Sequence, residues 1–342
     1  MNKRIFALFA AVALGAGMYA QPPVYQIEKR PSGGFASVPE EGVGEVKGGE
    51  GGNVVFIRSV SELETELGKL RTDKPKNTPV PTVFVFSGNY THSSKMLYVK
   101  YIENVTLVGD GTAVFEHFGL IVQYAENIII RNITFDGLER QSSGSSDDGI
   151  CIEYGSHHIW VDHCTFTDHY DGSLDTKKQA RNVTVSWNRF YNHSKNCLVG
   201  HDDKESADVV MTTTFHHNFF DGTAQRNPRV RFGKAHVYNN YYTGNSIYGI
   251  VSACNADVFV EGNYMEDVQH PSYCGYDKSP VGDLEERNNV LVRSGAFVTH
   301  GTTFEPHDYY DYTVDDPYSL PEYIPAGAGA GKFDFSYMWL GG

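Results

Sequence analysis

Three aspartates are spaced so that one coiled chain could bring them together. Asp171 and Asp175 lie four residues apart, and Asp148 precedes Asp171 by 23 residues. Side chains at even spacing in a strand share a face, and a repeat of that length would stack Asp148 beside the other two. Clustered carboxylates repel each other unless a hard cation lies among them, and oxygen-only ligands favour Ca²⁺. The spacing predicts a calcium site, although Asp-Gly pairs also serve as ordinary turns.

Basic residues follow the aspartates at a related spacing. Lys195 lies 24 residues past Asp171, and Arg226 and Arg231 lie 31 and 36 residues past Lys195. Basic groups above an acidic calcium site suit a ligand that carries carboxylates, because calcium bridges carboxylates while Lys and Arg neutralise the remaining charge. A surface network of salt bridges among the same residues is the alternative interpretation.

Other side chains give weaker support for chemistry. His163 and His236 lie in strand-like segments beside Asn residues, where a hydrogen bond in a turn or in the core is the more common role. The chain contains no Gly-x-Ser-x-Gly elbow, so a serine hydrolase triad has little support. No cysteine pair has the C-x-x-C spacing of a thiolate zinc site.

A short β-type segment recurs along the chain and would position these residues. Its copies begin near Asn104, Asn127, His158 and Asn182, at intervals of 23, 31 and 24 residues. The polar residues that recur at the following bends are Asn132, His163, Asn188, Asn218, Asn240 and Asn263. A leucine-rich horseshoe has a similar period, but the chain lacks its leucine lattice and its helices. Short strands joined by turns, with Asn at left-handed bends, predict an all-β fold, a parallel β-helix (solenoid).

The ends of this coil must be covered. Ser61-Glu-Leu-Glu64 has the pattern of a capping box and predicts a short N-terminal capping helix. The leucines on one face of that helix are Leu63, Leu67 and Leu70. Residues 309–342 are rich in Tyr, Pro and Gly, and we expect them to pack along the outside. No long linker interrupts the repeat, so we interpret residues 21–342 as a single domain.

The first 20 residues have the layout of a secretory signal peptide. Lys3 and Arg4 precede an apolar run, which small residues follow. We therefore expect residues 1–20 to be removed and the protein to be secreted or periplasmic. No other stretch is long and apolar enough to span a bilayer. The formal net charge of the 342-residue chain is −14, which argues against nucleic acid or an anionic membrane as the partner. We expect a monomer.

Five cysteines lie in the chain, an odd number that leaves at least one thiol outside a disulfide. Cys151, Cys164 and Cys197 fall within β-type segments, and we interpret them as buried core residues. Cys254 and Cys274 remain, and we predict a disulfide between them.

These motifs resemble those of the pectate lyases of polysaccharide lyase family 1. The resemblance extends over nearly the whole mature chain, from Gly48 to Tyr264. The motifs that carry it are Trp160-Val-Asp-His163, Asp171-x-x-x-Asp175, Thr184-Val-Ser-Trp-Asn188, Lys195-x-x-x-x-Gly200 and Arg226-Asn-Pro-Arg-Val-Arg231-Phe-Gly233.

The resemblance implies a right-handed parallel β-helix that cleaves α-1,4-linked polygalacturonate by calcium-assisted β-elimination. The residues that match the family's calcium ligands are Asp148, Asp171 and Asp175. Arg226 matches the base that removes the C5 proton, and Lys195 and Arg231 match residues that bind substrate carboxylates. The chain departs from the family pattern at Ser146, next to Asp147, where some members have a further acidic ligand.

The implied reaction fits the charges of these residues. Removal of the C5 proton builds negative charge beside a carboxylate, which Ca²⁺, Lys195 and Arg231 would stabilise. A free guanidinium loses its proton only above about pH 12, so an arginine base predicts an alkaline optimum.

Three rival functions stay open. A pectin lyase acts on methyl-esterified chains and would need no carboxylate-held calcium. A polygalacturonase needs one carboxyl group as acid and a second that activates water. A β-helical protein that only binds polysaccharide would keep the fold and lose nothing but affinity when Arg226 is replaced.

Overall fold

The computed structural model describes residues 33–40, 42–138 and 148–332. The predicted signal peptide at residues 1–20, together with Ser146 and Asp147, lies outside these residues. Within the described part of the chain, no helix is both long enough and apolar enough to cross a membrane.

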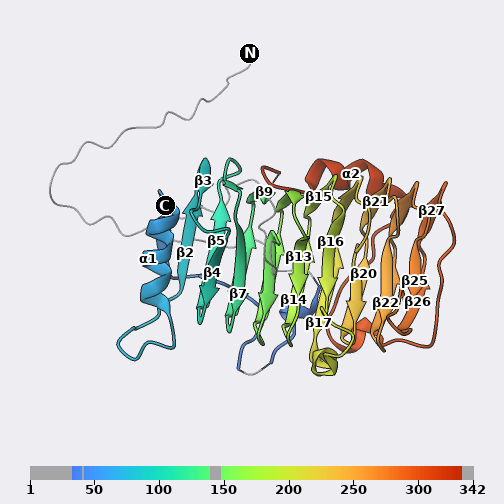
Figure 1. Ribbon diagram of the computed structural model, residues 1–342, viewed down its shortest axis with the longest axis horizontal. Helices are drawn as coiled ribbons and strands as arrows, with labels where there is room; N and C mark the ends of the chain where they lie inside the picture. The colour runs from blue at the N-terminus through green and yellow to red at the C-terminus, as the bar shows by residue number, and fades with distance from the viewer. Residues whose placement is uncertain (1–32, 41, 139–147, 333–342) are drawn as a thin grey trace, which may run out of the picture.

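The chain winds into three parallel sheets that run beside one another along the long axis of the molecule (Figure 1). Strands that are neighbours in a sheet come from successive turns of the coil. The repeated segments pair in register, with Val105 opposite Ile128, Ile128 opposite Ile159, and Ile159 opposite Val183. The sequence repeat is therefore a repeat of paired strands, and the prediction of an all-β parallel β-helix is confirmed.

The ten-stranded sheet consists of β1 (Asn53–Phe56), β2 (Thr82–Phe86), β5 (Glu103–Gly109), β8 (Glu126–Arg131), β11 (His157–Asp162), β14 (Arg181–Ser186), β17 (Thr212–His216), β20 (Lys234–Tyr238), β23 (Asp257–Glu261) and β26 (Asp283–Arg287). The eight-stranded sheet consists of β4 (Met96–Lys100), β7 (Gly119–Gln123), β10 (Ile150–Glu153), β13 (Gly172–Thr176), β16 (Lys195–Val199), β19 (Arg229–Arg231), β22 (Ile250–Ala253) and β25 (Ser272–Cys274).

The nine-stranded sheet consists of β3 (Asn89–Thr91), β6 (Val114–Glu116), β9 (Thr134–Leu138), β12 (Thr165–His169), β15 (Arg189–Tyr191), β18 (Phe219–Asp221), β21 (Tyr241–Thr243), β24 (Tyr264–Glu266) and β27 (Val290–Val292). The helices are α1 (Val60–Leu70), α2 (Leu320–Gly327) and the short 3₁₀ segments η1 (Phe35–Ser37), η2 (Ser206–Val210), η3 (Pro306–Asp308) and η4 (Pro317–Ser319).

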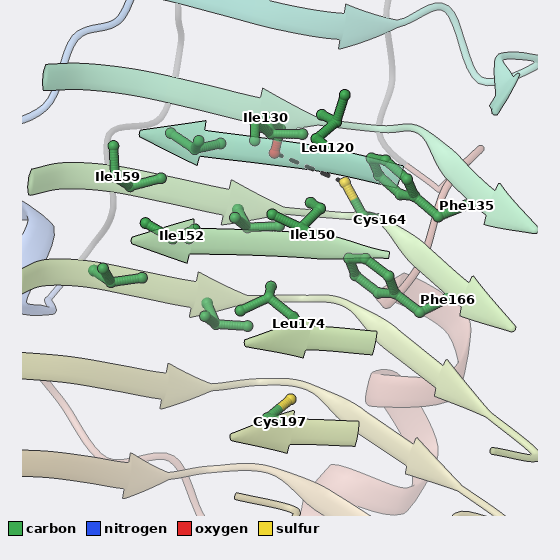
Figure 2. Packing of buried hydrophobic residues seen from close by; sticks show 14 of the residues in the cluster. Leu120, Ile130, Phe135, Ile150, Ile152, Ile159, Cys164, Phe166, Leu174 and Cys197 are labelled. Carbon is green, nitrogen blue, oxygen red and sulfur yellow. Dashed lines mark hydrogen bonds between the residues drawn. The ribbon is translucent and has the colours of Figure 1, made fainter. Parts of the chain in front are cut away.

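Apolar side chains stack from turn to turn inside the coil (Figure 2). The residues that stack along the eight-stranded sheet include Leu120, Ile150, Leu174 and Cys197. From the nine-stranded sheet, Phe135, Phe166 and Phe190 form a parallel stack with ring centroids 5.2 and 5.1 Å apart. Because side chains alternate along a strand, the residues between these core positions face outward and line up on the surface of each sheet.

A ladder of asparagine side chains holds one bend of the coil together. Its members include Asn188, Asn218, Asn240 and Asn263. Asn218 Oδ1 accepts the Asn188 N–H at 3.0 Å, and Asn240 Oδ1 accepts the Asn218 N–H at 2.9 Å. The left-handed backbone lies one residue earlier, at Trp187 (φ 53°) and His217 (φ 55°). The expected left-handed backbone is absent at Asn188 and Asn218, whose side chains instead bond the next turn. It is present at Asn104 (φ 57°), Asn127 (φ 54°), Asn132 (φ 59°) and Asn182 (φ 50°).

Helix α1 stands at the N-terminal end of the coil (Figure 1). The leucines that it buries in the main core are Leu63, Leu67 and Leu70. Its N-cap is Ser59, whose Oγ accepts the Glu62 N–H at 3.2 Å, while Glu62 Oε2 accepts the Arg58 N–H at 2.8 Å. The capping box predicted at Ser61 is wrong by two residues, because Ser61 already lies inside the first helical turn.

The corrected cap gives a paired test. Ser59→Ala is expected to lower the free energy of unfolding by about 1 kcal/mol, because it leaves an N–H of the first turn without its partner. Ser61→Ala is expected to change it by less than about 0.5 kcal/mol. Denaturant titration of both variants measures the difference, and equal losses would contradict the assignment of Ser59 as the cap.

The C-terminal segment lies along the outside of the coil, as predicted, up to residue 332 (Figure 1). Leu320 and Ile324 of α2 pack against Phe219 and Tyr241 of the nine-stranded sheet. Tyr310 covers the ten-stranded sheet and bonds the Thr214 hydroxyl at 2.9 Å. This segment therefore shields two of the three outer faces in part.

The predicted disulfide between Cys254 and Cys274 is wrong, because all five cysteines are free thiols. Cys274 packs against the main core, whereas Cys254 follows β22 and packs with Tyr248 and Val251 in an outer cluster. Two thiols directed to different sides of a sheet cannot reach disulfide geometry. The cysteines predicted to be buried, Cys151, Cys164 and Cys197, are each 0% exposed.

Candidate functional site

The predicted site residues lie on the outer face of the eight-stranded sheet and at its leading edge. Asp175 lies in β13, opposite Leu198 of β16, which in turn lies opposite Arg229 of β19. Asp148 and Asp171 lie just before β10 and β13. Parallel pairing therefore brings together residues that are far apart in the chain, because every turn of the coil returns to the same face.

Asp148 and Asp175 form a buried pair of carboxylates around Gly172. Asp148 is 1% exposed and Asp175 is 2% exposed. Asp148 Oδ1 accepts the Gly172 N–H at 2.8 Å, and Asp175 Oδ1 accepts the Leu198 N–H at 3.1 Å. A Cβ atom on Gly172 would lie 3.0 Å from Asp148 Oδ1 and 2.4 Å from Asp175 Oδ1. A residue without a side chain is therefore required where the two carboxylates approach each other.

Lys177 lies between these two carboxylates. Its Nζ is 3.1 Å from Asp148 Oδ2 and 3.6 Å from Asp175 Oδ2. Burial raises the pKa of Asp175 to about 7, with the charge of Asp148 adding to the shift, and burial also raises the pKa of Asp148. Burial opposes the charge on Lys177, but the carboxylates, Asp175 foremost, raise the pKa of Lys177 above its usual range. One ammonium thus compensates two buried carboxylates only in part, and the site favours further positive charge.

Asp171 lies at the rim of the pair together with two basic residues. Its Oδ1 is 2.9 Å from Lys195 Nζ and 3.6 Å from Arg226 Nη1. Partial burial opposes ionisation, but the Lys195 hydrogen bond and the Arg226 charge hold the pKa of Asp171 below its usual range. The charge of Asp171 also raises the pKa of Asp148 and of Asp175. The three acids therefore share one electrostatic environment.

Arg226 is fixed by its backbone and has an unused polar atom. Its backbone is left-handed, with φ 61°, and its carbonyl accepts the Cys197 N–H at 2.6 Å. Its Nε is buried and has no hydrogen-bond partner within the described residues. The left-handed backbone recurs at bends of this coil, as at Trp187 and Arg293, and it therefore marks a bend. A buried polar atom without a partner is the rarer feature, and it is one that functional sites often contain.

Arg231 lies on the same sheet but contacts other residues. Its Nε donates to Asp203 Oδ1 at 2.6 Å, and its Nη1 donates to the Gly200 carbonyl at 3.0 Å. Arg229 lies between Arg231 and Arg226, and burial followed by the charges of these two arginines lowers the pKa of Arg229. The structure therefore brings five of the six predicted residues into one group that also contains Lys177, and it places Arg231 beside this group. The five are Asp148, Asp171, Asp175, Lys195 and Arg226.

The donor atoms suit a hard cation. Among residues 33–40, 42–138 and 148–332, no group of three or more His, Cys, Asp or Glu side chains could hold a metal ion. Asp148 and Asp175 nevertheless offer carboxylate oxygens with partly uncompensated charge, the donor type that Ca²⁺ prefers, while Asp171 is turned to Lys195. The buried pair fits a calcium ion, because added positive charge would stabilise the ionised form of two carboxyl groups whose pKa values are raised chiefly by burial.

From the sequence we predicted no role for three residues of this region, Lys177, Arg229 and Asp203. Lys177 follows Asp175 by two residues, and Arg229 precedes Arg231 by two. Strand alternation places residues two apart on one face, so this signal was present for both. Asp203 lies in a loop after β16, where no periodicity applies, and its contact with Arg231 carries no sequence signal.

The two histidines lie away from this group. His236 of β20 is 0% exposed; its Nδ1 lies 2.7 Å from Tyr310 Oη and its Nε2 lies 3.1 Å from Glu261 Oε1. His163 Nδ1 lies 2.6 Å from Asp162 Oδ2. The expected hydrogen-bonding role in the core or in a bend is confirmed for both.

Known proteins match this chain over most of its length. A family model described as pectate lyase matches residues 25–320. A pectate trisaccharide-lyase of Thermotoga maritima is 37% identical over 347 aligned residues, covering 89% of this chain and 90% of the relative. A pectate trisaccharide-lyase of Bacillus licheniformis is 34% identical, covering 88% of this chain and 86% of the relative. The crystal structure of a pectate lyase from a Bacillus species in complex with trigalacturonate has a TM-score of 0.77 and 26% identity, covering 87% of this chain and 98% of that one.

Proposed function

This chain belongs to the pectate lyase family of polysaccharide lyases, and we propose that it cleaves α-1,4-linked polygalacturonate by calcium-assisted β-elimination. The new chain end is a 4,5-unsaturated galacturonate. The observation that carries the proposal is the position of Arg226, which lies 3.6 Å from Asp171 beside the buried pair Asp148 and Asp175. An acidic cation site and a basic substrate site thereby border each other on one sheet face.

Arg226 is proposed as the base. It removes the C5 proton, the electron pair of the C5–H bond forms the C4–C5 double bond, and the C4–O bond breaks as the leaving oxygen takes up a proton. Because Arg226 Nε is buried, the guanidinium meets the substrate through its terminal nitrogens, of which Nη1 lies 3.6 Å from Asp171 Oδ1. Its contact with Asp171 orients the side chain toward the rim of the acid pair.

Lys195 and Arg231 are proposed to bind carboxylates of the substrate. Their charges would stabilise the negative charge that develops as the C5 proton leaves. Lys195 reaches the site from the start of β16, and Arg231 from the end of β19. The proposed calcium ligands are Asp148, Asp171 and Asp175. Bound calcium supplies positive charge that helps to hold and polarise substrate carboxylates.

The geometry disfavours the rival functions. A polygalacturonase needs two carboxyl groups that reach the scissile bond and a water molecule, whereas Asp148 and Asp175 are buried and lie against Lys177. A pectin lyase binds a neutral chain and has no use for a calcium site made of carboxylates, whereas Asp148 and Asp175 form a buried acidic pair with Asp171 at its rim. A protein that only binds polysaccharide would release no unsaturated product, which the following assay measures.

One assay tests the proposal. Purified protein is mixed with polygalacturonate in the presence of Ca²⁺ or of a chelator, and the ultraviolet absorbance of unsaturated product is followed. We expect a calcium-dependent increase in absorbance, with a rate that rises toward alkaline pH because a guanidinium gives up its proton only at high pH. Saturated reducing ends would indicate hydrolysis, and a rate that peaks at acid pH would contradict the arginine base.

The site of action follows from the substrate. Polygalacturonate is a polymer too large to cross a membrane unaided, so we propose that the chain acts in the periplasm or outside the cell, as a monomer. N-terminal sequencing of the exported protein tests removal of residues 1–20, and an intact N-terminus on the exported protein would contradict it.

A further inference from the structure

Two loops meet above the outer face of the eight-stranded sheet. One follows β16 and contains Asp203, and the other follows β25 and contains Ser279. Ser279 Oγ donates to Asp203 Oδ1 at 2.8 Å, although the two residues are 76 positions apart. The loops border a cleft of about 370 Å³, which Arg229 and Arg231 also line.

One carboxylate sets the orientation of two guanidinium groups. Asp203 Oδ1 accepts the Arg231 Nε–H at 2.6 Å. The Ser279 hydroxyl, which donates to the same Asp203 oxygen, accepts from Arg229 Nη2 at 2.7 Å. Burial opposes the ionisation of Asp203, but its hydrogen bonds with Ser279 and Arg231 hold the pKa of Asp203 below its usual range. A network with Asp203 at its centre thus joins both loops to both arginines.

Asp203 contacts Arg231 at Nε, and this position of the contact favours a role for Asp203 in orienting Arg231. A guanidinium binds a carboxylate through N–H groups in a fixed plane, so the orientation of that plane decides whether a substrate carboxylate can be bound. Asp203 contacts Nε, and the Gly200 carbonyl accepts from Nη1. Nη2 has no hydrogen-bond partner among the residues that the structure describes. The contacts of Nε and Nη1 therefore fix the guanidinium plane and leave Nη2 for a ligand in the cleft that Arg231 lines, whereas a carboxylate that blocked the site would also occupy Nη2.

We propose that Asp203 is a positioning residue that holds Arg231, and through Ser279 also Arg229, in the orientation that binds a carboxylate of the acidic polysaccharide in this cleft. The inference rests on the proposed function, because the ligand must carry carboxylates. Asp203 itself does not touch the substrate; its negative charge and its two hydrogen bonds act through the arginines.

Substitution of Asp203 tests this role. Asp203→Ala is expected to raise KM for polygalacturonate about tenfold and to leave kcat within about threefold, because Arg231 keeps its positive charge near the reacting carbon but loses the fixed orientation with which it binds the substrate carboxylate. Asp203→Asn keeps the acceptor oxygen without the charge and is expected to give a smaller increase. Asp203→Glu is expected to restore part of the affinity, since it returns the charge.

Asp202 offers a matched control. It lines the same cleft and carries the same charge, but its carboxylate accepts the backbone N–H of Lys204 at 2.9 Å. In the described part of the chain it forms no salt bridge with either arginine. Asp202→Asn removes a negative charge from the same cleft without breaking a contact with either arginine, so KM is expected to fall or to stay within about twofold of wild type. A rise in KM that is confined to the Asp203 variants therefore shows that the position of the charge matters and not its presence alone.

A double-mutant cycle separates positioning from loop stability. If Asp203 acts through the arginines, adding Asp203→Ala to Arg231→Ala raises KM only by the smaller part that passes through Ser279 to Arg229, so the two effects are far from additive. Additive effects on KM, accompanied by a fall in Tm that Asp202→Asn does not share, would indicate a structural brace and overturn the proposal.

The wild-type protein is assayed in parallel. If wild type releases unsaturated product and Asp203→Ala retains the wild-type KM, the positioning role is wrong and the lyase activity stands. If wild type leaves polygalacturonate intact, the proposed function and the inference built on it are both overturned.

Discussion

Arg226→Ala is expected to lower kcat on polygalacturonate by about 10³-fold. The reason is that the substitution removes the proposed base while leaving Lys195, Arg231 and the acid pair in place. The dissociation constant for trigalacturonate is expected to change by less than about fivefold, since a base acts mainly in the transition state. Product absorbance measures the first quantity and calorimetry without turnover measures the second.

Two further variants test whether the loss of activity in Arg226→Ala is specific to the guanidinium at this position. Arg226→Lys keeps a positive charge near Asp171 but loses the guanidinium, and it is expected to remain strongly impaired. Arg189→Ala also removes an arginine that pairs with an aspartate, because Arg189 of β15 lies 2.5 Å from Asp221 on the nine-stranded sheet. It is expected to retain wild-type kcat. A fully active Arg226→Ala variant would exclude Arg226 as the base.

Asp175→Asn is expected to have opposite effects on activity and on stability. Activity at a fixed calcium concentration is expected to fall about 10²-fold, because a proposed ligand loses its charge. The calcium-free protein is expected to be at least as stable as wild type at pH 8. The measurements are initial rates across a calcium titration and Tm with and without calcium.

The stability effect follows from the sign of the pKa shift. In the folded protein the pKa of Asp175 is raised from 3.8 to about 7, by burial first and by Asp148 second. When a carboxyl group has a higher pKa in the folded than in the unfolded protein, the free energy of unfolding falls as the pH rises from about 4 to 7. The reason is that the native state keeps the proton up to a higher pH than the unfolded state does. At pH 8 the ionised Asp175 is therefore a destabilising charge, and the neutral amide removes it.

Glu153→Gln is the matched control for this experiment. Glu153 lies in β10 of the same sheet, is 4% exposed, and pairs with Lys178 at 2.8 Å. Its substitution is expected to leave both the calcium-induced rise in Tm and the calcium dependence of the rate unchanged. If Asp175→Asn responds to calcium as wild type does, Asp175 is not a calcium ligand.

The solenoid could be predicted because its signal is local and repeated. Segments near Asn104, Asn127, His158 and Asn182 become the adjacent strands β5, β8, β11 and β14. Each turn of the coil imposes the same requirements for strand, bend and core residue, so errors at one position do not disturb the period. The aspartates and Lys195 could be placed on one face for the same reason.

Predictions that depended on a single position were less successful. The helix cap lies at Ser59 and not at Ser61, since two serines two residues apart satisfy the same sequence pattern. The disulfide between Cys254 and Cys274 is absent because spacing along the chain does not reveal which side of a sheet each thiol faces.

The amino-acid sequence by itself determined the coil, its period and the face on which acids and bases gather, because these follow from strand alternation and from a repeat that pairs each turn with the next. Tertiary structure decided which charges become partners. Lys177 compensates Asp148 and Asp175, Asp171 bonds Lys195, and Arg231 turns to Asp203. These choices depend on burial and on the loops that close over the sheet, and both are set by contacts between residues that no repeat relates.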